Sequence, residues 1–159
     1  MSLTSVRGTV SATWFKIGAF MPRTRSKTDA VVKELRKFGL TYPGAHLKSP
    51  WPGHKDLAVN DKTFAYLSVE GELFSISCKL PRSAEAALLL PFAVPTAYGL
   101  GKSGWVSAKF EPGQRPPIDL LCEWIDESYR AIAPKTLVKQ LDEVAGATEH
   151  AVAPARRRR

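Results

Sequence analysis

The feature that most constrains the fold is a predicted strand over residues 72–80, in which apolar and polar side chains alternate strictly from Phe74 to Leu80. Every second residue is apolar: Phe74, Ile76, Cys78 and Leu80. The residues between them are polar: Ser75, Ser77 and Lys79. The preceding residues 63–69 are rich in β-forming types, and Glu70-Gly71 forms a two-residue turn in which glycine supplies a positive φ. The pattern predicts a hairpin with one buried and one solvated face, as in an antiparallel sheet covered on one side.

Helical patterns flank this hairpin. Residues 28–38 repeat apolar side chains at helical spacing between a cap at Thr28 or Asp29 and a stop at Gly39. The other predicted elements are a strand over 55–59, a short helix over 83–90 capped by Ser83, a strand over 105–110, a long helix that begins at Pro116 or Pro117, and a helical segment over 136–144. The order predicts an α+β fold, an antiparallel sheet with helices packed on one face.

The length of 159 residues suits one domain, which we place at residues 28–145. Residues 1–27 read as a basic, flexible N-terminal extension, and residues 146–159 as a disordered basic tail. Two other interpretations of the start stay open. It is also typical of a mitochondrial-type targeting segment, or Met21 is the native first residue.

The formal net charge of +8 suggests a nucleic-acid partner, but what it implies depends on where the charged residues lie in the sequence. Residues 1–27 hold five basic residues and no acid, and residues 156–159 are four arginines. Residues 28–155 hold 14 basic and 15 acidic residues. The basicity therefore belongs to the two ends, and the predicted domain is nearly neutral.

Two cysteines, one in a predicted strand and one in a predicted helix, do not form a disulfide framework. The longest apolar run, residues 86–94, is too short to span a bilayer and contains a proline. These features favour a soluble protein in the reducing cytoplasm.

Four motifs carry a family resemblance. They are Asn60-Asp-Lys-Thr-Phe-Ala, Ser75-Ile-Ser-Cys-Lys79, Tyr98-Gly-Leu-Gly-Lys-Ser-Gly-Trp105 and Trp124-Ile-Asp-Glu-Ser-Tyr129. With these motifs in this order, the chain resembles the MmcQ/YjbR family over about residues 28–141. The resemblance implies a frataxin-like (CyaY-like) α/β fold and a DNA-binding role proposed for the family. Many members carry a histidine where this chain has Gly99, so no imidazole role at that position is carried over.

The candidate nucleic-acid-binding residues combine the basic side chains around the sheet, one aromatic residue and the basic tail. They are Lys48, Lys62, Lys79, Arg82, Lys102, Trp105, Lys109, Arg156, Arg157, Arg158 and Arg159. Residues 46–110 carry a net charge of +2, whereas residues 118–149 carry a net charge of −4, so the charge of the domain is polarised along the chain. If the lysines share one sheet face, they meet a phosphate backbone without reading its sequence. Ordinary solvated lysines are the alternative.

Enzymatic and metal-binding functions find little support. The glycine-rich loop over residues 99–104 lacks the spacing of a P-loop and precedes a predicted strand rather than a helix. The three histidines and two cysteines show no metal-ligand spacing. We therefore expect a non-enzymatic protein without cofactor or metal, with DNA as the partner. The alternative is an adaptor domain that binds a protein, for which the acidic residues Asp119, Glu123, Asp126 and Glu127 are the candidate surface.

Overall fold

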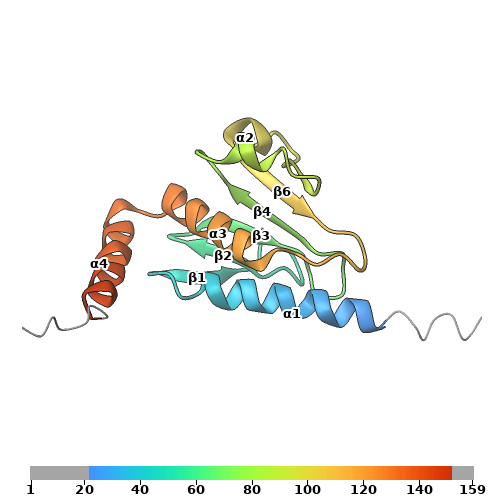
Figure 1. Cartoon of the computed structure of the whole chain (residues 1–159), viewed down its shortest axis with the longest axis horizontal. Helices are drawn as coiled ribbons and strands as arrows, with labels where there is room; N and C mark the ends of the chain where they lie inside the picture. The colour runs from blue at the N-terminus through green and yellow to red at the C-terminus, as the bar shows by residue number, and fades with distance from the viewer. Residues whose placement is uncertain (1–21, 152–159) are drawn as a thin grey trace, which may run out of the picture.

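A computed structural model describes residues 22–151, and its centre is a six-stranded sheet in which all neighbouring strands are antiparallel (Figure 1). The strand order is β1-β2-β3-β4-β6-β5. The strands are β1 (Ala45–Lys48), β2 (Asp56–Val59), β3 (Lys62–Leu67), β4 (Ser75–Lys79), β5 (Ala93–Pro95) and β6 (Trp105–Lys109). The helices are α1 (Pro22–Gly39), α2 (Ala84–Ala87), α3 (Ile118–Ile132) and α4 (Lys135–Ala151), with a 3-10 turn η1 (Leu100–Ser103).

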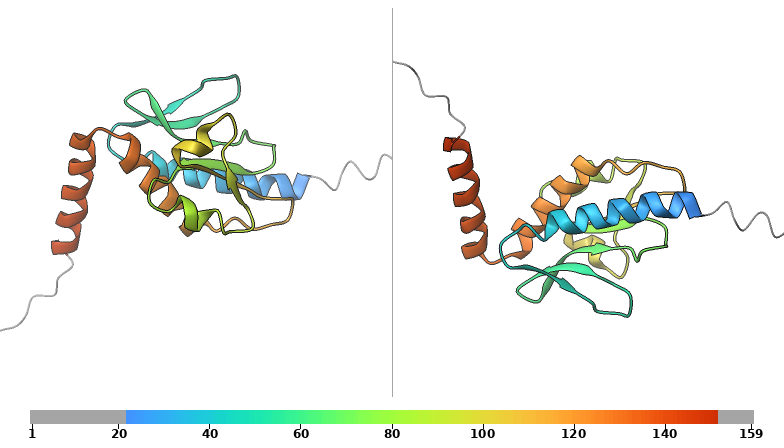
Figure 2. Two further views of the ribbon diagram at one scale, coloured as in Figure 1. Left: turned by 90° about the horizontal axis from the view of Figure 1, so that it is seen from above. Right: turned by 90° about the horizontal axis from the view of Figure 1, so that it is seen from below.

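Two long helices, α1 and α3, pack on one face of the sheet. Helix α3 contacts β3 and β4, while α1 lies beside α3 and contacts β2 (Figures 1 and 2). Gly39 lets the end of α1 approach β2, because a Cβ atom there would collide with the side chain of Leu57. The predicted α+β architecture, an antiparallel sheet with helices on one face, is confirmed.

The core follows the alternation predicted for the hairpin. Ile76 and Cys78 on β4 are fully buried together with Leu121 and Ile125 of α3. Burial of such apolar side chains stabilises the folded state by about 25 cal/mol for each Å² of apolar surface removed from water. The apolar face of β4 is thus the face that α3 covers.

A β-bulge adds an aromatic ring to this core. The register between β2 and β3 shifts at Leu57/Ala58, so that Phe64 and Ala65 are both fully buried in successive positions. The Phe64 ring meets the ring of Tyr129 edge to face, with centroids 5.4 Å apart. The turn before β3 is a tight one, with positive φ at both Asn60 and Asp61, residue types that tolerate this conformation.

Ser128 joins α3 to the sheet through the backbone of two strands. Its hydroxyl accepts a hydrogen bond from the amide of Lys79 at 2.8 Å and donates one to the carbonyl of Phe64. These two backbone groups lie just beyond the last paired residues of β3 and β4, Ala65 and Cys78. The hydroxyl therefore occupies the position at which the next ladder hydrogen bond would form.

Several boundaries differ from the sequence predictions. Helix α1 begins at Pro22, so residues 22–27 belong to a helix rather than to a flexible extension, and α4 continues through Gly146 to Ala151 rather than becoming disordered at residue 146. Strand β4 begins at Ser75 instead of residue 72, because residues 68–74 form a longer turn than Glu70-Gly71 alone. Strands β1 and β5 were not predicted. Residues 1–21 and 152–159 lie outside the described residues.

The Ser83 side chain does not cap α2 as the sequence predicts. Its hydroxyl donates instead to Oε2 of Glu127 on α3, at 2.7 Å. Helix α4 projects from the end of the domain (Figures 1 and 2) and is joined to α3 by the ion pair between Arg130 and Asp142, at 2.8 Å.

Replacing Ser128 with alanine is expected to destabilise the fold by about 1–3 kcal/mol, because the amide of Lys79 and the carbonyl of Phe64 both lose their partner. Urea unfolding followed by circular dichroism measures the change. The exposed Ser103→Ala is the matched control and should stay within about 0.5 kcal/mol of the wild type. Equal stabilities of the two variants would contradict the bridging role of Ser128.

Candidate nucleic-acid interface

The sheet face away from α1 and α3 carries a row of polar and basic side chains. Residues directly opposite each other on antiparallel strands share a face. In the β4–β6 pair Ser75 lies opposite Lys109, Ser77 opposite Ser107, and Lys79 opposite Trp105. These residues alternate with the buried Ile76 and Cys78, so they lie on the opposite face, here called the outer face. Two lysines thus stand at opposite ends of it.

Hydroxyl groups connect the middle of the outer face. Ser77 and Ser107 share a hydrogen bond of 2.6 Å between their Oγ atoms, and the hydroxyl of Thr96, just after β5, lies 2.9 Å from Ser107. Hydroxyl hydrogens rotate to suit their partners. Of these three hydroxyl groups, that of Ser107 is buried, so only those of the half-buried Ser77 and Thr96 can point a donor outward.

The predicted stacking residue Trp105 lies on the outer face but is only 7% exposed. Its ring packs against Tyr66 of β3, with centroids 5.3 Å apart, and Tyr66 is half-buried. The more accessible aromatic surface of this face therefore belongs to Tyr66. Tyr98, in the loop before η1, is fully exposed.

Charge differs between the central strands and helix α3, whereas α1 is itself basic. Strands β3, β4, β5 and β6 contain no aspartate or glutamate and contribute Lys62, Lys79 and Lys109. Helix α3 carries the four acidic residues named above as the candidate surface for a protein partner, Asp119, Glu123, Asp126 and Glu127. The polarity that the sequence shows along the chain is therefore also a polarity between the sheet and the helix that covers it.

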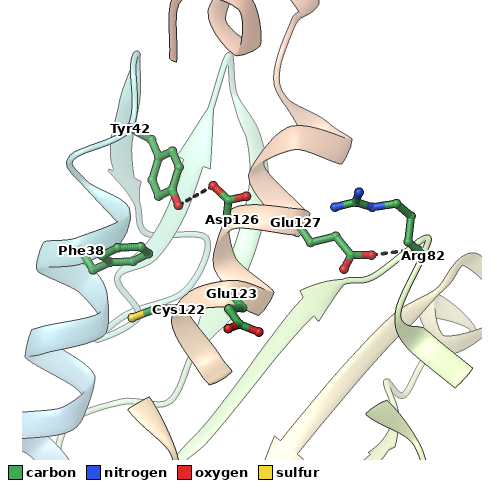
Figure 3. A pocket seen from close by; sticks show the side chains of 7 residues that line it. All are labelled: Phe38, Tyr42, Arg82, Cys122, Glu123, Asp126 and Glu127. Atoms are coloured by element: carbon green, nitrogen blue, oxygen red, sulfur yellow. Dashed lines mark hydrogen bonds between the residues drawn. The ribbon is translucent and has the colours of Figure 1, made fainter. Parts of the chain in front are cut away.

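The other predicted basic residues of the described chain do not belong to the β4–β6 pair. Lys48 lies opposite Asp56 on the edge strand β1, so it is on the outer side of the sheet but three strands away from β4. The ammonium group of Lys48 donates to the carbonyl of Asp61 at 2.6 Å. Lys62 pairs with Val59, whose side chain is in the core, so Lys62 shares the helix-covered side at the end of its strand. Arg82 lies beside α3 (Figure 3). Lys102 is exposed on η1, which contacts β5 and β6, and the four C-terminal arginines lie outside the described residues.

The glycine-rich loop forms a turn rather than a phosphate cradle. Gly99 and Gly104 have positive φ at the two ends of η1, and strand β6 follows directly. The carbonyl of Gly104 accepts a hydrogen bond from the amide of Leu80 at 2.8 Å. The loop therefore fixes the start of β6 beside β4, and with it the position of Trp105 opposite Lys79.

An acidic pocket of about 470 Å³ lies on the other side of the domain, on α3 (Figure 3). Its lining residues are Phe38, Tyr42, Arg82, Cys122, Glu123, Asp126 and Glu127. The Tyr42 hydroxyl donates to Oδ1 of Asp126 at 2.8 Å, and burial together with this carboxylate raises the pKa of Tyr42. Burial, Asp119 and Glu34 raise the pKa of the Cys122 thiol, so it is not activated as a nucleophile.

Glu127, a second carboxylate of this pocket, accepts three hydrogen bonds. Its Oε1 accepts hydrogen bonds from the amides of Arg82 and Ser83, at 2.8 and 3.1 Å, in addition to the Ser83 hydroxyl bond on Oε2. Burial acts to raise the pKa of Glu127, but the three hydrogen bonds and the nearby Arg82 guanidinium outweigh it and lower the pKa below its ordinary value. Glu127 therefore ties the segment after β4 to α3 as a carboxylate.

Among the described residues, no group of three or more histidine, cysteine, aspartate or glutamate side chains is arranged to hold a metal ion. His46 lies in β1, with Nδ1 3.3 Å from the carbonyl of Gly44, and His54 packs against Trp51. None of the helices in residues 22–151 is both long and apolar enough to cross a membrane.

Fold and surface together define a small α+β domain with two lysines on the outer face of its sheet and four acidic residues on helix α3. The family model described as YjbR matches residues 40–131, more than half of the chain. The chain belongs to the YjbR family. It is also similar to a protein of known crystal structure from Pseudomonas syringae, with 18% sequence identity and a TM-score of 0.41, over 55% of this chain and 86% of that chain. No curated protein matches the sequence.

The variant Glu127→Gln is expected to lose on the order of 1 kcal/mol of stability at neutral pH, since an amide accepts these hydrogen bonds less strongly than a carboxylate. A carboxylate whose folded pKa is lowered stabilises the fold above its unfolded pKa of about 4.3 and loses that contribution as pH falls through the folded value. The difference from the wild type should therefore shrink as the solution is acidified below about pH 4.

Urea unfolding at several pH values measures this difference. Glu123→Gln, an exposed carboxylate on the same helix, is the control and should show little change at any pH. A difference between wild type and Glu127→Gln that stays constant from neutral to acidic pH would show that the charge of Glu127 is not the source of the stabilisation.

Proposed function

We propose that this YjbR-family protein is a non-enzymatic DNA-binding protein that contacts the phosphate backbone through the outer face of its sheet and its arginine tail, Arg156 to Arg159. The observation that supports the proposal is the position of Lys79 and Lys109 at the two ends of the β4–β6 pair, whose strands carry no carboxylate. Within residues 22–151, neither lysine has an ion-pair partner.

The spacing of these lysines suits a polyanion. Lys79 and Lys109 are four positions apart along the β4–β6 ladder, which corresponds to about 14 Å of strand. Duplex DNA carries one negative charge per about 1.7 Å of its axis, so the face spans several phosphates. Contacts of this kind hold the backbone and carry no base information, so the binding is sequence-independent and sensitive to salt.

The double variant Lys79→Gln/Lys109→Gln is expected to bind duplex DNA about tenfold more weakly than the wild type and to lower the slope of log K against log salt by about 2. Fluorescence anisotropy with a labelled duplex, between about 50 and 200 mM salt, measures both quantities. The control is Lys135→Gln/Lys139→Gln, which removes the same number of positive charges from α4, away from the sheet.

A third variant, with Arg156 to Arg159 replaced by glutamine, separates the tail from the domain. It should lower the salt slope by up to about 4 while leaving measurable binding at low salt. Complete loss of binding in this variant would assign the activity to the tail. Absence of binding by the full chain at about 50 mM salt would overturn the proposed function.

The acidic pocket on α3 favours a second candidate function, binding of a basic protein partner. Three carboxylates line this pocket beside the half-buried Phe38 ring, an arrangement suited to a lysine or arginine side chain with an apolar stem. Glu123→Lys reverses one exposed charge there. An adaptor role predicts that this variant loses a protein partner that the wild type retains after nuclease treatment, while DNA binding is unchanged.

A further inference from the structure

A second cavity lies where the outer face ends, beside the last residue of β6. It measures about 610 Å³, within the range of about 300–1,000 Å³ typical of ligand sites. Its lining residues are Pro91, Phe92, Val94, Lys109, Phe110, Glu111, Gln114, Arg115 and Pro117. They come from two segments, one leading into and through β5 and one leading from β6 to α3.

Aromatic and proline side chains form the apolar part of this cavity. The rings of Phe92 and Phe110 are stacked, with centroids 4.8 Å apart and planes inclined by 29°. Phe110 is buried, while Phe92 is half-buried and keeps part of its surface accessible. A planar ring that enters the cavity therefore meets an aromatic side chain already fixed in place by a second one.

Two cations lie around this apolar part. Lys109 and Arg115 are both exposed, and within residues 22–151 neither forms an ion pair, even though Glu111 lines the same cavity. The Gln114 carbonyl oxygen accepts the amide of Glu111 at 2.8 Å, which leaves the NH₂ group of Gln114 as a donor. The cavity thus combines an aromatic surface, free positive charge and hydrogen-bonding groups of both kinds.

The cavity is continuous with the outer face. Lys109 belongs to both, since it stands opposite Ser75 on β4 and also lines the cavity. On the far side, Gln114 and Arg115 also line a neighbouring cavity of about 360 Å³, to which Lys27 of α1 contributes and no carboxylate does. A chain of phosphates that leaves the outer face at Lys109 therefore meets further positive charge beyond the cavity.

We propose that this cavity accepts an unpaired nucleobase, so that the protein prefers single-stranded to duplex DNA. The inference rests on the proposed function and deepens it. The base lies against Phe92, while its flanking phosphates contact Lys109 and Arg115. In a duplex the bases are paired and stacked inside the helix and do not reach the cavity, whereas those of a single strand are free to stack on protein aromatics.

The test compares a labelled oligothymidine of about 15 nucleotides with a duplex of equal length, by anisotropy at low salt. The wild type is expected to bind the single strand at least about fivefold more tightly, although the duplex carries the higher charge density. Phe92→Leu keeps the apolar volume but removes the ring. It should weaken single-strand binding about five- to tenfold and leave duplex binding unchanged.

Trp51→Leu, which removes an exposed aromatic ring outside the cavity, is the matched control and should change neither affinity. If Phe92→Leu does not fold, Arg115→Gln replaces it, since Arg115 is exposed. This variant should lower the salt slope by about 1 for the single strand alone. Lys135→Gln is its control.

The possible outcomes show whether this inference fails alone or together with the proposed function. Equal affinities for single strand and duplex, with no effect of Phe92→Leu or Arg115→Gln, would overturn the base site and leave the DNA-binding function standing. Displacement of the single strand by polyglutamate, equally from wild type and Phe92→Leu, would show that charge alone is recognised and would also overturn it. No binding of either DNA at low salt would overturn both proposals.

Discussion

The attachment of α3 to the sheet determines where every surface of this domain lies. The Ser128 hydroxyl takes the place of a ladder hydrogen bond between β3 and β4, and the neighbouring Tyr129 packs against Phe64 and donates to the carbonyl of Pro43 at 2.8 Å. Rotation of α3 about its axis would break these hydrogen bonds, each of which leaves a buried group unpaired when lost. The acidic side of α3 is thereby fixed away from the sheet, and the lysines of β4 and β6 are left on the opposite layer.

The sequence predicts most of the outer face, because strand alternation is a local property. The alternating pattern of residues 72–80 correctly places Ile76 and Cys78 in the core and Lys79 on the opposite face. What it does not contain is the partner of each strand. Lys79, Lys102 and Lys109 look equivalent as loop and strand lysines, but the register of β4 with β6 unites only Lys79 and Lys109 on one face. The cavity at the end of β6 was missed for the same reason, since β5 has only three residues and no alternating pattern.

The acidic residues of α3 and the lysines of β4 and β6 give a nearly neutral domain an uneven distribution of charge. Residues 28–155 carry one more acid than base, so net charge alone does not attract them to a polyanion. An oriented distribution of charge still steers a molecule, because the potential near each face depends on the local charges more than on their sum. A polyanion bound to the outer face as proposed would lie on the side of the sheet away from the acidic groups of α3.

The edge of the sheet beside the proposed base site offers no amide donor to an added strand. The amide of Lys109 donates to the carbonyl of Phe92, and the amide of Thr96 donates to the carbonyl of Trp105, so Ala93 and Pro95 direct their backbone groups outward. The outward amide of Ala93 is already bonded to the carbonyl of Leu90, and Pro95 has no amide hydrogen. An extended peptide consequently finds no amide donor along β5. The hydrogen-bond donors at this end of the molecule are therefore side chains, among them Lys109 and Arg115 beside the aromatic ring of Phe92.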